Sequence, residues 1–108
     1  MGEVQLAFET DVNSNIIPGG TKIVEILEVP VFAASWTAIT PTKAGKTFTG
    51  RMSVSSIAFD VSDTVGGSKK YSFWAGESFD ANMAVSADET VFWVKPASDG
   101  TFNLMLLG

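Results

Sequence analysis

Two strand-like segments near the end of the sequence limit the fold more than any other feature. Residues 90–94 and 101–107 are both rich in apolar residues, and residues 95–100 connect them with Pro96 and Gly100. We predict that they form a β-hairpin. A strand that covers a core on one side alternates apolar with polar residues, because successive side chains point to opposite faces. These segments barely alternate, so we expect both faces of the hairpin to be shielded from water.

Two pairs of adjacent aromatic residues sharpen this expectation. Phe73 precedes Trp74, and Phe92 precedes Trp93. In a strand, one ring of each pair can enter the core, while the other needs cover from a loop, a ligand or another protein. Burying a large aromatic side chain contributes ~2–3 kcal/mol, which is a large share of the stability of a small domain. Exposed apolar area of several hundred Å² generally marks an interaction site.

The rest of the sequence reads as further short strands separated by turn residues. Residues 21–29 have both helical and strand spacing, but four β-branched residues in seven favour a strand. In residues 47–62 the apolar positions change phase, which predicts a bulge near Ser55 and Ser56. The other expected strands are residues 4–8, 31–40, 71–75 and 79–85, and a hairpin turn is expected at 63–70.

This pattern predicts a single all-β domain over residues 1–108, an antiparallel β-sandwich or barrel of about eight short strands. Residues 1–20 are expected to form an extended N-terminal arm, because loop-forming residues follow the first strand. The length of 108 residues suits one core. With 45% hydrophobic and 18% charged residues the composition is that of a globular protein.

Charge and residue types exclude several classes of function. A net charge of −5 has the wrong sign for binding a phosphate backbone, so we expect no nucleic-acid partner. No apolar run approaches the ~20 residues that span a bilayer, so we expect no membrane partner. The chain has no cysteine and no histidine, which removes the thiolate nucleophile, the commonest general base and the usual ligands of zinc. We therefore expect no enzyme activity, no cofactor and no metal site.

One short motif has the spacing of a calcium site. Asp11, Asn13 and Asn15 lie at the one-three-five positions of a calcium-binding loop. However, Ile16 stands where that loop has glycine, and Lys22 stands where it has a bidentate glutamate. A solvated turn rich in Asp and Asn explains these residues better.

The preferred functional interpretation is a non-enzymatic structural or assembly protein that forms a homo-oligomer or docks on a larger particle. The expected partners are other protein chains, either copies of itself or capsid or tail proteins. The arm through Pro18 and the terminal hairpin are the expected contact elements. The interface candidates are Trp74, Trp93, Phe102, Leu104, Leu106, Ile16 and Ile17.

In general character the chain resembles the small accessory proteins of tailed-phage virions, such as capsid decoration and tail-associated proteins. Like them it is short, acidic and free of cysteine, and its first residues lack the basic start and apolar block of a secretion signal. No single motif carries the resemblance. It implies a location in a virion or in the cytoplasm.

The alternative interpretation is a carbohydrate-binding module. Such modules stack sugar rings on exposed aromatic side chains, and Tyr71, Trp74 and Trp93 are the candidates here. In a two-layer sandwich, however, most rings of this kind belong to the core. The exposure of these three side chains in the folded protein therefore bears directly on both interpretations.

Overall fold

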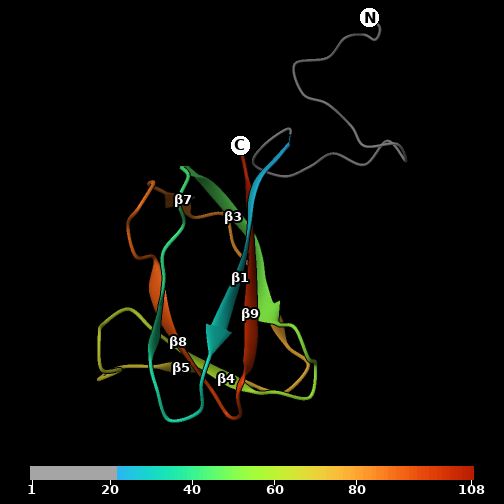
Figure 1. Cartoon of the computed structure of the whole chain (residues 1–108), viewed down its shortest axis with the longest axis vertical. Helices are drawn as coiled ribbons and strands as arrows, with labels where there is room; N and C mark the ends of the chain where they lie inside the picture. The colour runs from blue at the N-terminus through green and yellow to red at the C-terminus, as the bar shows by residue number, and fades with distance from the viewer. Residues whose placement is uncertain (1–21) are drawn as a thin grey trace, which may run out of the picture.

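Alternating burial along short strands builds two antiparallel sheets that pack face to face. The computed structural model describes residues 22–108, and residues 1–21 lie outside this description (Figure 1). The strands are β1 (Ile23–Val31), β2 (Thr37–Ile39), β3 (Gly45–Met52), β4 (Phe59–Ser62), β5 (Tyr71–Phe73), β6 (Ser78–Asp80), β7 (Ala84–Val85), β8 (Phe92–Pro96) and β9 (Gly100–Leu107). The predicted antiparallel sandwich is confirmed, with nine strands in these residues.

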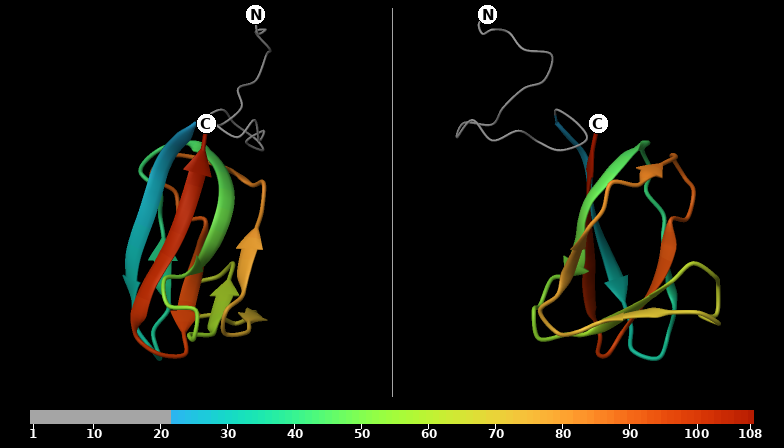
Figure 2. Two further views of the ribbon diagram at one scale, coloured as in Figure 1. Left: turned by 90° about the vertical axis from the view of Figure 1, so that its right-hand side faces the viewer. Right: turned by 180° about the vertical axis from the view of Figure 1, so that it is seen from behind.

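The two sheets have different strand orders. The five-stranded sheet has the order β1-β9-β3-β6, and β7 also pairs with β3. The left view of Figure 2 shows these four strands side by side, in the order β1 (blue), β9 (red), β3 (green) and β6 (orange). The four-stranded sheet has the order β2-β8-β4-β5. Consequently β1 and β6 end one sheet, while β2 and β5 end the other.

The core lies between the central strands of the two sheets. Phe92 and Val94 of β8 face Phe102, Leu104 and Leu106 of β9, and all five side chains are buried. The rings of Phe92 and Phe102 meet edge to face with centroids 5.9 Å apart. This is a favoured geometry for aromatic pairs, so the core has specific as well as hydrophobic packing.

The predicted terminal hairpin is wrong. β8 pairs with β2 and β4, and β9 pairs with β1 and β3, so the connection between them crosses from one sheet to the other. Asp99 in this connection accepts a hydrogen bond from the backbone N–H of Ala33, at 2.9 Å. The weak alternation has a simple explanation: each strand is central in its own sheet, and its outer face also carries large side chains such as Trp93 and Met105.

Residues 47–62 also cross between the sheets. They contain most of β3 and all of β4, which belong to opposite sheets, and residues 53–58 connect them. The change in apolar phase therefore reflects this crossing. A register shift does occur, but between Thr47 and Thr49 and not near Ser55 and Ser56.

The other strand predictions near the start of the chain have different outcomes. Residues 21–29 do contain a strand, and β1 continues through Pro30 to Val31. Proline is tolerated there because β1 is an edge strand and its missing N–H faces no partner. Residues 31–40 are not one strand, because the chain turns at Ala34, which has a φ of 64°, before the short β2. The predicted strand at residues 4–8 lies outside the described residues.

Candidate functional site

The two aromatic pairs divide as predicted, with one ring of each pair facing the core. Phe73 points inward and stacks on Phe59 with ring centroids 4.8 Å apart, whereas Trp74 is 78% exposed. Phe92 is buried in the core, whereas Trp93 lies half-buried on the outer face of the four-stranded sheet. The expectation that most such rings belong to the core is wrong for Tyr71, which is 69% exposed, and for Trp74.

The loop at residues 63–70 covers part of the outer face beside Trp93. Ser62 is in register with Trp93 on that face and is almost completely buried. Its hydroxyl donates to the carbonyl oxygen of Lys69 at 2.5 Å and accepts the N–H of Thr64 at 3.2 Å. A buried hydroxyl needs such partners, so these bonds tie the loop to the sheet.

The same loop packs on a third tryptophan. This loop joins β4 to β5 as the predicted hairpin, with Gly66 at φ 85° and Gly67 at φ 67°. A Cβ atom at Gly67 would lie 2.3 Å from the ring of Trp36, so the glycine permits this contact. The ammonium of Lys95 lies 5.9 Å from the centre of the same ring. The chain thus supplies its own cover for this part of the sheet.

Three of the predicted interface residues lie in the core. Phe102, Leu104 and Leu106 have no exposed surface, because their side of β9 faces the other sheet. The interface prediction is corrected for these three, which cannot reach a partner while the domain is folded. Trp74 and Trp93 are accessible, and Ile16 and Ile17 lie outside the described residues.

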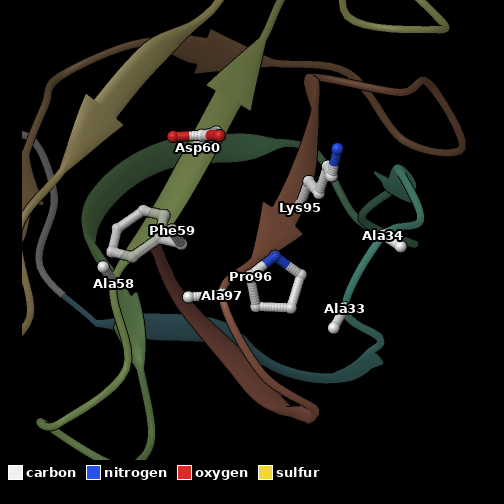
Figure 3. Close-up of a pocket in the computed structure, with 8 residues that line it drawn as sticks. All are labelled: Ala33, Ala34, Ala58, Phe59, Asp60, Lys95, Pro96 and Ala97. Atoms are coloured by element: carbon white, nitrogen blue, oxygen red, sulfur yellow. The ribbon is translucent and has the colours of Figure 1, made fainter.

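The structure has a wide depression lined by small side chains. Figure 3 shows Ala33, Ala34, Ala58 and Ala97 around it, with Asp60 and Lys95 on adjacent strands. Its volume is about 430 Å³. Asp60 already pairs with Lys70, at 3.6 Å. Apart from Asp60 and Lys95, the lining consists of alanine methyl groups and the rings of Phe59 and Pro96. It therefore offers few polar groups to fix the orientation of a ligand.

A second depression lies on the outer face of the five-stranded sheet. Its volume is about 460 Å³, and it includes the exposed Ile26 beside Met105. Glu28, Arg51 and Asn103 share this lining. A mixed face of this kind is typical of a solvated sheet surface, where isolated apolar side chains are normal.

The third depression is lined almost entirely by apolar side chains, and we call it the aromatic groove. Its volume is about 380 Å³. The lining consists of Val61, Tyr71, Phe73, Phe79, Met83, Val91 and Phe92, with Asp63 as the single charged member. Met83 is 40% exposed, and Tyr71 is more exposed still.

The rings of the aromatic groove are continuous with the core. The ring centroids of Tyr71 and Phe73 are 5.1 Å apart, and those of Phe73 and Phe79 are 5.6 Å apart. Phe79 in turn meets Phe92 edge to face at 5.7 Å. The groove is therefore an exposed part of the same aromatic cluster that stabilises the domain.

The groove is open because two sheet ends meet there. β5 ends the four-stranded sheet and β6 ends the five-stranded sheet, and a turn at Gly76 (φ 85°) joins them. Within residues 22–108 no strand pairs with the free edge of β5. Gly50 of β3 lies beneath Phe79, and a Cβ there would be 2.5 Å from the ring. This glycine lets Phe79 lie close against β3 and form one wall.

The described residues contain no group of three or more acidic side chains arranged to hold a metal ion. Within residues 22–108 no helix is long and apolar enough to cross a membrane. Comparison of the chain with family models, with curated proteins and with solved structures finds no match. The aromatic groove is therefore the best-defined candidate site.

The sequence indicates only part of this groove. It singles out Tyr71 and the two aromatic pairs, which include Phe73 and Phe92. Phe79 and Met83 belong to the strand predicted at residues 79–85, which the structure divides between β6 and β7. Alternation at residues 79–85 did indicate an apolar face. It did not indicate that this face would meet the open end of the other sheet.

Proposed function

We propose that the chain is a non-enzymatic assembly protein that binds other protein chains through the aromatic groove. The observation that supports this most strongly is the exposure of Tyr71 and Met83 beside Phe73 and Phe79, in a groove continuous with the core. Each large side chain that a partner buried would contribute ~2–3 kcal/mol to binding.

The lining favours a protein partner over a small molecule. Small-molecule sites combine apolar walls with several polar groups that fix the orientation of the ligand. Here Asp63 is the single charged group in the lining. Tyr, Phe and Met are enriched in the centres of protein interfaces, where charged residues are scarce.

We further propose that the assembly is a larger particle of the virion type. Support comes from the general character of the chain: it is small, acidic and free of cysteine. One open apolar groove on a small domain is suited to repeated contacts with identical neighbours. Capsid decoration or association with a phage tail is the proposed role.

Light scattering during size-exclusion chromatography tests the proposed function. At micromolar concentration the protein is expected to form a defined oligomer, and Tyr71→Asp is expected to be monomeric. The control is Ile26→Asp, because Ile26 is 58% exposed but lies on the outer face of the other sheet. A parent protein that remains monomeric and does not bind its source particle would contradict the proposal.

Carbohydrate binding is a second candidate, supported by the exposed rings of Tyr71 and Trp74. It predicts binding on a glycan array and quenching of tryptophan fluorescence by the same sugar. Trp74→Ala is expected to remove both signals. Silence in both assays for the unmodified protein would reject this candidate.

A further inference from the structure

We propose that the aromatic groove binds residues 4–8 of a second copy of this chain, as an added strand on the free edge of β5. This inference rests on the proposed function and names the partner at the same site. It belongs to a known mode of recognition, in which an extended segment joins a sheet edge and its alternate side chains fill pockets.

The edge of β5 has the geometry that such a strand requires. Within the described residues β5 pairs with β4 and has no partner on its other side. Tyr71 and Phe73 are in register with Val61 and Phe59, so their rings point toward the space between the sheets. A strand added to this edge would continue the four-stranded sheet and place every second side chain in the groove.

Residues 4–8 have the pattern that such a position requires. Val4, Leu6 and Phe8 alternate with Gln5 and Ala7, which predicts a strand with one strongly apolar face. Alternate residues of a strand are ~6.7 Å apart, which is also the repeat of Tyr71 and Phe73 along β5. The apolar face can therefore follow the rings of β5 in register.

Charges next to the two segments favour an antiparallel arrangement. Lys69 and Lys70 directly precede Tyr71 on the described chain, and Lys70 is more than half exposed. Glu9 and Asp11 follow Phe8. If the added strand runs antiparallel to β5, its acidic end lies beside these lysines. Complementary charges of this kind contribute mainly to the direction and register of binding.

The start of β1 and the length of chain before it allow residues 4–8 to reach the groove of a neighbouring molecule. β1 ends the five-stranded sheet on the side opposite β6, with β9 and β3 between them (Figure 2). Residues 9–21 can span at most about 45 Å when extended, which is enough to reach a neighbour. Each copy then gives one strand and receives one. Reciprocal exchange between two copies closes a dimer, and exchange around a ring closes a larger defined oligomer.

The test uses two full-length variants that are defective on opposite sides of the contact. Leu6→Asp places a charge on the apolar face of the donated strand, and Tyr71→Asp places a charge in the groove. Each variant alone is expected to be monomeric in light scattering. When they are mixed, the groove of the Leu6→Asp protein can receive the intact strand of the Tyr71→Asp protein. A complex of one copy of each is therefore expected.

Matched controls keep this test specific. Gln5→Asp adds the same charge on the other face of the predicted strand and is expected to assemble as the parent does. Met83→Asp is a second groove variant and is expected to repeat the behaviour of Tyr71→Asp. Circular dichroism and thermal unfolding of each variant establish that it is folded before its association is measured.

The outcomes separate this inference from the proposed function. Normal assembly of Leu6→Asp together with loss of assembly in both groove variants would overturn the inference but leave the proposed function intact. Failure of the two defective variants to form a complex on mixing would also overturn the inference. Normal assembly of the groove variants would overturn both the inference and the proposed function.

Discussion

Gly66 and Gly67 offer a matched pair of substitutions that tests how the β4–β5 loop covers the four-stranded sheet. Both residues have positive φ angles, of 85° and 67°. They differ in their surroundings: a Cβ at Gly66 would meet open space, whereas a Cβ at Gly67 would lie 2.3 Å from the ring of Trp36. Replacing each with alanine therefore separates backbone strain from displacement of the tryptophan.

The expected magnitudes follow from these two effects. An L-residue at positive φ costs ~1–2 kcal/mol, so Gly66→Ala should lower the free energy of unfolding by ~1 kcal/mol. Gly67→Ala has the same strain and must also move Trp36, which loses buried area and its contact with Lys95. The total loss should be ~2–4 kcal/mol. In a domain of this size 1 kcal/mol corresponds to about 4–8 °C in Tm.

Urea unfolding followed by circular dichroism measures both losses, and tryptophan fluorescence reports the displaced ring. The decisive control is the same pair of substitutions in a Trp36→Ala background. There the ring is absent, so Gly67→Ala should cost no more than Gly66→Ala. Equal losses in the parent protein, or an excess that persists without Trp36, would refute the proposed packing of the loop on this ring.

Three further substitutions test other parts of the fold, and urea unfolding measures each. Leu106→Ala should cost ~2–5 kcal/mol, because the side chain is fully buried between the sheets; a loss below 1 kcal/mol would contradict this position. Ser62→Ala should cost ~1–3 kcal/mol, because the N–H of Thr64 and the carbonyl of Lys69 lose their partner; an unchanged stability would mean that water replaces the hydroxyl. Glu25→Ala should cost ~1–2 kcal/mol, because its carboxylate accepts three hydrogen bonds from residues 42–43. Glu25→Gln keeps one acceptor oxygen and should retain part of that stability, and equal losses for the two variants would contradict the contribution of these hydrogen bonds.

Local patterns in the sequence were sufficient for the fold class. Alternation of apolar residues and turn chemistry act over a few residues, so the antiparallel sandwich and the hairpin at residues 63–70 were predicted correctly. The division of each aromatic pair was also predicted, because adjacent strand residues always point to opposite faces.

Strand pairing could not be predicted, because it depends on contacts between distant residues. The connection predicted at residues 95–100 suits either a hairpin or a crossing between sheets. Apolar residues on both faces of β8 and β9 do not indicate which strands they pair with. For the same reason Phe102, Leu104 and Leu106 were chosen as interface residues, although their face of β9 is the core face. The aromatic groove depends on the positions of β5 and β6 at the ends of two sheets, which only the complete topology defines.

The central position of β9 has a consequence for the order of folding. β1 and β3 are neighbours in the five-stranded sheet only through β9, and Leu107 pairs with Ile23 at the other end of the described chain. Most of this sheet therefore cannot form until residues 100–107 have been synthesised. Folds dominated by such distant pairings form slowly, and their unpaired strands are exposed to other chains in the meantime. We therefore expect loss of β9 to prevent folding, and new chains to be most prone to misassociation before β9 docks.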